Sequence, residues 1–569
     1  MSARLACAAI CLVSAVLALD DASSALAADS QAVSPAPTLT RPSSPSKPPP
    51  QHFLSALQAT AIAARESKLQ DELRKHDHTR HEAFATAPGM WQVSYYAGGK
   101  EVAQVIVDER LGRATQVWTG PQVAWQMARG LPGAFGRKVN SPAVWIPLML
   151  AFFVPFFDWR RPFRMLHLDL LVLLAFSISH VYFNRGEIFT SVPLVYPVLL
   201  YLLARLVYVA YARSAAPSRR PLRLLVPVSW LALALIFLVG FRIGLNITNS
   251  NVIDVGYSGV IGADRLTHGK ALYGDFPADN PSGDTYGPVN YYAYVPFEQV
   301  FPWSGRWDDL PAAHAAALFF DLATMAALFW AGRRITPGRG GNRTGVVLAY
   351  AWATYPYTLF VLSSNANDSL VALLVVLAFG ALAAPRARGA LLALASAAKF
   401  APLALAPLFA SYDRRRMRDA VAFGLAMAAV LVIVFLPVLG REGLGHFWDR
   451  TVGFQLGRES PFSIWGQHPQ FGWAQSAAKV AMVLFALGVA FVPARKSPIQ
   501  LAALAAAVLI ALQLTLSHWF YLYIVWWFPL AAIALLARPL GVSDGPPPAR
   551  SPARSRSPAP LRRIPQRSP

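Results

Sequence analysis

The sequence predicts an all-α polytopic membrane protein that carries a small α+β domain outside the membrane at its N-terminus. Apolar residues make up 55% of the 569 residues and charged residues only 14%, a composition typical of a chain built largely of lipid-spanning helices. Apolar runs of membrane-spanning length recur from residue 141 onward. The net charge of +21 comes from short basic clusters between these runs. That arrangement follows the positive-inside rule and does not indicate a nucleic-acid-binding surface.

Residues 1–28 have the pattern of a secretory signal peptide. Arg4 supplies the positive charge, Leu5–Leu19 form the apolar core, and Ala25-Leu26-Ala27 offers a small-residue cleavage site. The alternative is a first transmembrane helix, for which this apolar core is short. The two cysteines, Cys7 and Cys11, lie in this segment, so the mature chain would have no disulfide.

Residues 29–52 are rich in Pro and Ser and are expected to form a disordered linker. Residues 53–138 are expected to form an extracytoplasmic module, with a polar helix over 53–76 and two strands at 91–95 and 102–108. Ala97-Gly98-Gly99 between the strands is a hairpin signal, and residues 117–120 could add a third strand. The Val-Asp-x-x-x-Gly pattern after the second strand resembles PepSY-like domains.

The membrane domain is expected over residues 139–538, with about eleven spans. Each span is near the length needed to cross the hydrocarbon core. The spans are expected at 141–157, 168–184, 190–212, 223–245, 312–332, 344–362, 368–384, 419–439, 472–493, 497–516 and 518–537.

Residues 388–412 form a further apolar segment, but both of its ends are rich in arginine. A full span would place one arginine cluster outside the cell and invert every later span. We therefore expect a re-entrant hairpin broken at Lys399-Phe400-Ala401-Pro402, because proline removes a helix donor and broken backbone is tolerated where protein covers it.

The remaining basic clusters are expected on the cytoplasmic face. They are Arg160/Arg161/Arg164, Arg219/Arg220/Arg223, Arg333/Arg334/Arg339/Arg343, Arg386/Arg388, Arg414/Arg415/Arg416/Arg418 and Arg495/Lys496. The Pro/Ser/Arg-rich tail, residues 539–569, is expected to be disordered and cytoplasmic, where it would contact anionic lipids or act only as an orientation signal.

The segment 246–311 is the longest expected exported loop within the membrane domain, and it reverses the charge balance of the chain. It holds eight acidic and three basic residues together with several tyrosines and tryptophans. Aromatic rings stack on sugar faces and carboxylates accept hydroxyl hydrogen bonds, so the composition suits a sugar site. The alternative is that the aromatic residues only mark the membrane interface.

Motifs in this loop resemble those of GT-C superfamily glycosyltransferases that use polyprenyl-phosphate sugars, and most closely the family 87 mannosyltransferases. The motifs are Asn251-Val-Ile-Asp254-Val-Gly-Tyr257, Gly269-Lys-Ala-Leu-Tyr273 and Asp284-Thr-Tyr286-Gly287-Pro288, the last with Gly where the family often has Pro. Ser364-Asn365-Ala-Asn367-Asp368, Ala398-Lys399-Phe-Ala-Pro402 and His518-Trp-Phe-Tyr521 extend the resemblance over roughly residues 225–535.

The resemblance implies that an acceptor hydroxyl attacks the anomeric carbon while polyprenyl phosphate leaves. Asp254 matches the family aspartate and is the candidate general base, with a turn or capping role as the alternative. Tyr257 would position it or only pack beside it. Asp264 and Asp284 are substitutes for Asp254, or else solvated turn residues.

Cations near the leaving phosphate would stabilise the developing charge. The candidates are Lys270, Lys399 and His518, and His518 could also help to deprotonate the acceptor. An isolated Lys399 in an apolar segment is costly and usually has an anionic partner, unless it reaches the cytoplasmic headgroups.

Arg242 is a candidate partner for lipid phosphate or for an acid in the adjoining loop. Asp321, within a span, is expected to pair inside the helix bundle. Tyr286 is assigned to substrate binding. Asn365 and Asp368 would shape the acceptor side or cap the following helix.

The sequence therefore predicts a membrane transferase of mannose or arabinose, acting on a cell-envelope glycolipid or glycan at the extracytoplasmic face. Its partners would be the polyprenyl-phosphate sugar, the acceptor and membrane lipids, without nucleic acid. No cofactor is expected, and no ligand spacing demands a metal, although loop carboxylates leave a divalent ion open. The alternatives are a multi-span transporter or lipid flippase, and a non-catalytic scaffold.

Overall fold

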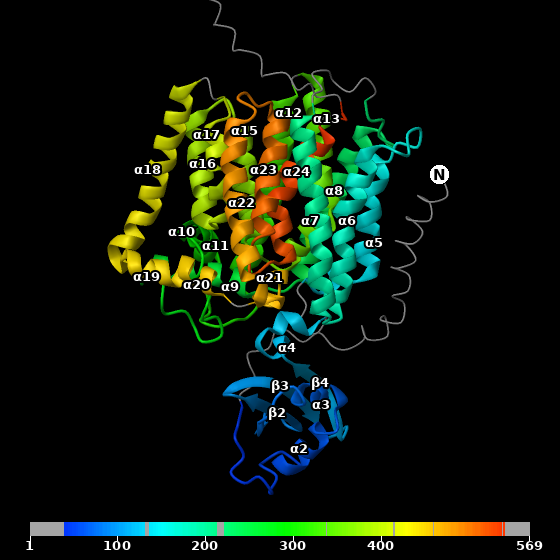
Figure 1. The fold of residues 1–569 in the computed structure, drawn as a ribbon, viewed down its shortest axis with the longest axis vertical. Coiled ribbons are helices and arrows are strands. Elements are labelled where there is room, and N and C mark those ends of the chain that lie inside the picture. Colours follow the sequence, from blue (N-terminus) through cyan, green and yellow to red (C-terminus); the bar gives the residue numbers. More distant parts are fainter. Residues whose placement is uncertain are drawn as a thin grey trace, which may run out of the picture.

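A computed structural model describes residues 39–130, 136–212, 221–336, 338–413, 416–458, 460–537 and 539–540. A small α+β module stands at one end of a large helical bundle (Figure 1). The expected signal peptide and residues 541–569 of the expected basic tail lie outside the described residues, as do Arg219, Arg220, Arg414 and Arg415.

The module is a four-stranded antiparallel sheet whose strands follow chain order. The predicted hairpin is confirmed: β2 (Met90–Ala97) pairs with β3 (Lys100–Asp108). Gly98 and Gly99 form its two-residue turn with φ of +55° and +82°, the positive values that such a turn requires. β4 (Arg113–Thr119) is the expected third strand, and β1 (Arg80–Ala85) is one that the sequence analysis missed.

Two further details of the module differ from expectation. The helix predicted over 53–76 is two short helices, α2 (Ala56–Ala63) and α3 (Ser67–Leu73). The expected disordered linker is ordered at its end, because Thr40 and Ala85 exchange two backbone hydrogen bonds of 2.9 Å. Backbone pairing with the edge strand therefore ties residues near Thr40 to the sheet.

The bundle is formed by helices that run between the module end and the opposite end (Figure 1). In chain order they are α5 (Pro142–Phe153), α6 (Met165–Asn184), α7 (Ile188–Tyr211), α8 (Val228–Thr248), α12 (Pro311–Ile335), α13 (Arg339–Thr354), α14 (Pro356–Ser363), α15 (Asp368–Gly380), α16 (Pro385–Ala398), α17 (Ala406–Ala410), α18 (Met417–Glu442), α22 (Gly472–Phe491), α23 (Pro498–Gln513) and α24 (Ile524–Leu536).

Six of these helices are long and apolar enough to span a membrane: α6, α7, α8, α12, α18 and the helix at 469–491 that includes α22. The helices α13 and α14 meet the same criteria together but are bent by 59° at Tyr355. The other expected spans contain apolar helices of 10–17 residues. The membrane character is thus confirmed, whereas the count of eleven stays a prediction.

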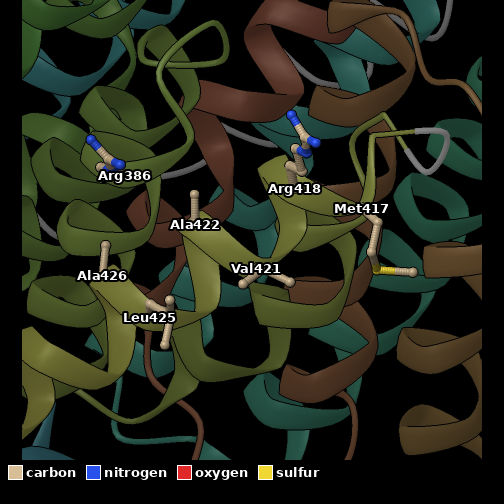
Figure 2. A pocket seen from close by; sticks show the side chains of 7 residues that line it. All are labelled: Arg386, Met417, Arg418, Val421, Ala422, Leu425 and Ala426. Atoms are coloured by element: carbon tan, nitrogen blue, oxygen red, sulfur yellow. The ribbon is translucent and has the colours of Figure 1, made fainter.

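The segment predicted to be a re-entrant hairpin is a broken helical segment, and its course within a membrane stays a prediction. Helix α16 ends at Ala398, just before Lys399, and a 3₁₀ segment, η6 (Ala401–Leu405), leads directly into α17. Arg386 at the start of α16 and Met417 and Arg418 at the start of α18 line one shallow pocket (Figure 2). Both ends of the segment therefore lie on the same side of the bundle.

Contacts bring several of the basic clusters together at the end of the bundle away from the module (Figure 1). Arg343 donates to the carbonyl of Leu222 at 3.3 Å, and Lys496 donates to the carbonyl of Ser411 at 3.4 Å. Each contact joins two segments that carry predicted cytoplasmic clusters, and which side of the membrane they face stays a prediction.

The expected outer loop is a folded insertion between α8 and α12. It contains α9 (Asp254–Thr267), α10 (Pro288–Tyr292) and α11 (Val295–Val300) at the module end of the bundle. Most tyrosine rings of this insertion are buried, among them Tyr257, Tyr291 and Tyr294, whereas Tyr286 and Tyr292 are half-buried. For the three buried residues packing is the observed role.

Candidate active site

The start of α9 is fixed against the turn between α14 and α15. Asn251 N–H donates to the carbonyl of Ser363 at 3.1 Å, and Ile253 N–H donates to that of Ser364 at 3.2 Å. Gly256 permits the close approach, because a Cβ there would collide with the carbonyl oxygen of Asn365. This pairing places Asp254, the first residue of α9, beside the first turn of α15.

Asp254 is the one exposed residue within 250–263, where every other residue is buried. Burial nevertheless raises the pKa of its carboxyl group, while the charges of Arg458 and Lys399 oppose that shift. Asp254 is thus accessible to water yet surrounded by protein. A carboxyl group that faces a water-filled space enclosed by protein has both properties. A carboxylate with a raised pKa and access to a ligand suits a general base.

Lys399 and Asp368 form a buried ion pair next to Asp254. Lys399 Nζ lies 2.6 Å from Asp368 Oδ1, and the same oxygen accepts a hydrogen bond of 2.7 Å from Trp526 Nε1. Lys399 thus has the anionic partner that its apolar surroundings predicted. The Asp368 hydrogen bonds to Lys399 and Trp526 both involve Oδ1, and its Oδ2 is buried without a partner.

Three aromatic rings surround the Lys399 ammonium group. Its nitrogen lies 5.3 Å from the ring centre of Tyr286, 5.4 Å from that of Trp526 and 5.9 Å from that of Tyr523. Rings at this distance stabilise a cation through their quadrupoles. Of the two tyrosines expected to bind substrate, Tyr286 therefore lies at the ion pair. Asp254 is close to it as well: burial raises the pKa of Tyr286 most, and the charge of Asp254 raises it further.

Gly287 brings Tyr286 to this position, and we expect Gly287→Ala to disturb it. The N–H of Gly287 donates to the carbonyl of Ala398 at 3.2 Å, and a Cβ at 287 would collide with the carbonyl oxygen of Ala397. Overpacking of this kind costs roughly 1–3 kcal/mol. Thermal unfolding in detergent and the transfer assay described below measure both effects. An unchanged melting temperature together with full activity would contradict the expected displacement of Tyr286.

Arg458 belongs to the same cluster, although the sequence analysis did not single it out. Of the neighbouring charges, that of Arg458 lowers the pKa of Asp254 most. It also lowers the pKa of Tyr286. It follows α20 (Phe454–Gly457), and its Nε is buried without a hydrogen-bond partner. An isolated arginine after an irregular segment gives no local signal, so only the fold could reveal it.

His518 lies close to Arg458 in the segment between α23 and α24. Its Nδ1 is 2.8 Å from Ser460 Oγ. Burial, and then the charge of Arg458, hold the pKa of His518 well below its usual range. The imidazole is therefore neutral near pH 7, which favours hydrogen bonding over a role as a phosphate-binding cation.

Arg242 is not available to a lipid phosphate, which corrects the expectation from the sequence. Arg242 and Asp321 side chains are both 0% exposed and are joined by hydrogen bonds of 2.6 and 2.9 Å. Arg242 also donates to the carbonyl of Ala353 and to Thr358 Oγ1. Asp321 is paired inside the bundle, as expected, and Arg242 is its partner.

Two other expected residues lie apart from Asp254. Lys270 is exposed beyond the C-terminal end of α9, a helix of 14 residues that separates it from Asp254 by about 20 Å at 1.5 Å per residue. Asp284 is buried in an ion pair with Arg450 at 2.6 Å and accepts the N–H of Gly274 at 2.7 Å. Its carboxylate oxygens are engaged with the protein.

Tyr257 and Asn365 act within the structure of the loop. The hydroxyl of Tyr257 donates to Asp279 at 3.4–3.5 Å, and its ring packs on Trp307. Asn365 accepts from Asn246 Nδ2 at 2.8 Å and donates to the carbonyl of Asn251 at 3.0 Å. Neither side chain is aimed at the Lys399–Asp368 pair, but Asn365 holds the segment that carries Asp254.

The described residues contain no group of three or more His, Cys, Asp or Glu side chains that could hold a metal ion. The pocket of Figure 2 is also separate from the cluster, because α16 runs 14 residues from Pro385 near that pocket to its end before Lys399, about 20 Å at helical rise. The candidate site is thus the cluster around Asp254, Lys399–Asp368, Arg458 and His518.

The fold and this cluster define a polytopic membrane protein with acidic and basic side chains gathered at one end of its helices. Residues 285–539 match the model of Glycosyltransferase family 87. The family resemblance found in the sequence motifs is therefore supported for this part of the chain, which is a little under half of its length. A comparison with curated proteins gave no match. The matched region contains Asp368, Lys399, Arg458 and His518 and begins after Asp254.

Proposed function

We propose that this protein is a membrane glycosyltransferase that moves mannose or arabinose from a polyprenyl-phosphate sugar to a cell-envelope glycolipid or glycan on the extracytoplasmic face. The observation that carries the proposal is the position of Asp254: an accessible carboxylate with a raised pKa, close to the charges of Lys399 and Arg458. The module and the site share one end of the bundle (Figure 1), so an exported module would place the site outside the cytoplasm as well.

In the proposed step, an acceptor hydroxyl oxygen forms a bond to the anomeric carbon, with inversion, as the bond from that carbon to the phosphate oxygen breaks. The hydroxyl proton passes to Asp254. The electron pair of the broken bond leaves with polyprenyl phosphate, whose negative charge rises from one to two. A nearby cation stabilises that charge, and Arg458, with its unpartnered Nε, is the best-placed donor.

Lys399 has a different role in this proposal, because Asp368 already neutralises it. The pair and its aromatic rings form a rigid wall beside Asp254. Asp368 Oδ2 has no partner, so it can accept a hydrogen bond from a sugar hydroxyl. His518, neutral and held by Ser460, can donate or accept a hydrogen bond near Arg458.

The test uses purified full-length protein in lipid nanodiscs. Polyprenyl-phosphate [14C]mannose and polyprenyl-phosphate [14C]arabinose are supplied in turn with extracted envelope glycolipids, and labelled product and released polyprenyl phosphate are measured. Transfer of either label supports the proposal. Movement of intact donor across proteoliposome membranes without any transfer would support a transporter and contradict it.

We expect the transfer rate to fall as the pH is lowered through the pKa of Asp254. The protonated carboxyl cannot accept the acceptor proton, so the group is active only above its pKa. Because burial raises this pKa above the ordinary aspartate value of about 3.9, the loss should begin at a higher pH than for an exposed aspartate. The pH profile of kcat/KM measures it, and a flat profile down to about pH 4 would contradict Asp254 as the base.

A further inference from the structure

Trp125 connects the exported module to the candidate site. It lies between α4 (Pro121–Ala124) and a 3₁₀ turn, η2 (Gln126–Arg129), in the segment that leads from β4 to the first bundle helix. Its ring centre is 5.5 Å from that of His518, and the guanidinium of Arg458 lies 5.0 Å from the ring centre. A side chain outside the family-matched region thus touches two residues of the site.

The module holds this segment in place from its own side. Lys68 of α3 donates to Gln122 Oε1 at 2.6 Å, and Arg129 donates to Gln104 Oε1 of β3 at 2.9 Å. Toward the bundle, Gln122 Nε2 donates to the carbonyl of Gly186 at 3.2 Å. The position of the Trp125 ring therefore depends on the folded module as well as on the bundle.

Arg458 has few other contacts that could orient it. Among the described residues no carboxylate forms an ion pair with Arg458, and its Nε has no hydrogen-bond partner. Its guanidinium group lies against two rings, Trp125 at 5.0 Å and Phe454 at 5.6 Å. Stacking on an aromatic face fixes the plane of a guanidinium while leaving its N–H groups free for an anion.

Trp125 also helps to enclose His518. Phe462 packs edge-on against both Trp125 and His518, with ring centres 5.6 Å and 5.5 Å away, respectively. The tryptophan thereby lies on the same side of the site as Arg458 and the neutral imidazole of His518.

We propose that the exported module is a working part of the transferase, with Trp125 as a positioning residue that orients Arg458 and His518 for the anionic group of the lipid donor. This inference rests on the proposed function, since it assigns a lipid phosphate to Arg458. On this proposal the site needs the folded module, because the module holds Trp125 in place.

The test compares Trp125→Leu, which keeps apolar bulk against Phe462, with Trp125→Phe, which keeps a ring. Two quantities are measured on full-length protein in nanodiscs: KM and kcat for the labelled donor, and binding of polyprenyl phosphate alone. We expect Trp125→Leu to raise KM and weaken polyprenyl-phosphate binding by about tenfold, between the effects of an exposed and a desolvated cation–π contact, with a smaller change in kcat. Trp125→Phe should recover most of this loss.

A double-mutant cycle separates positioning from general stability. If Trp125 acts through Arg458, then Trp125→Leu should weaken binding little further in an Arg458→Gln protein. Leu111→Ala, in the exposed turn between β3 and β4, is the matched module control and should behave as wild type.

Wild-type binding of polyprenyl phosphate by the Trp125→Leu protein, or fully additive losses in the cycle, would overturn the role of Trp125. The proposed function fails separately, if the wild-type protein binds polyprenyl phosphate but transfers neither sugar. The binding readout still tests Trp125 in that case.

Discussion

Asp254→Asn is expected to lower the transfer rate by about 10²- to 10⁴-fold, the usual contribution of a general base. Asparagine has nearly the same shape but cannot take the proton from the acceptor hydroxyl. Binding of polyprenyl phosphate should remain within a few-fold of wild type, because Asp254 is not assigned to the leaving group. The measurement is kcat for the labelled donor, with thermal unfolding to confirm that the variant is folded.

Asp264→Asn is the matched control for that result. Asp264 lies ten residues later on the same helix, about 15 Å along its axis, and its carboxylate lies 3.1 Å from His268 Nδ1. It should retain wild-type activity. Equal losses in the two variants, or a loss in Asp264→Asn alone, would remove Asp254 from its proposed role.

Arg242→Met should destabilise the protein by about 3–5 kcal/mol, because it leaves the buried carboxylate of Asp321 without its charge partner. Trp352 Nε1 still donates to Asp321 at 2.8 Å, but one neutral hydrogen bond does not replace a guanidinium. The double variant Arg242→Met/Asp321→Leu should recover much of the loss, since an apolar pair of similar size removes both charges. Unfolding in mixed detergent micelles measures all three proteins.

The exposed pair Arg416–Asp419 provides the control for the buried pair. Its side chains are 67% and 39% exposed, so Arg416→Met should change stability by less than about 1 kcal/mol. The double variant at 242 and 321 also tests the earlier expectation for Arg242. If it folds normally but no longer binds polyprenyl phosphate, then Arg242 contacts the donor after all.

Local sequence patterns predicted the features that depend on local chemistry. Apolar runs mark the bundle helices because lipid excludes charge over their length. Gly98-Gly99 predicts the hairpin because its turn requires positive φ. Arginines at both ends of 388–412 and a proline after Lys399 predicted a break in this segment, and the helix does break there, with both ends of the segment near one pocket.

Only the tertiary structure decided which side chains meet. Arg242 is paired with Asp321, 79 residues away, and Asp284 with Arg450, 166 residues away. Such pairings depend on how distant helices pack, and no periodicity in the chain encodes them. For the same reason motifs pointed to Asp254 and Lys399, whereas no local pattern pointed to Arg458 or Trp125. The contact between these two residues forms only where the module meets the bundle.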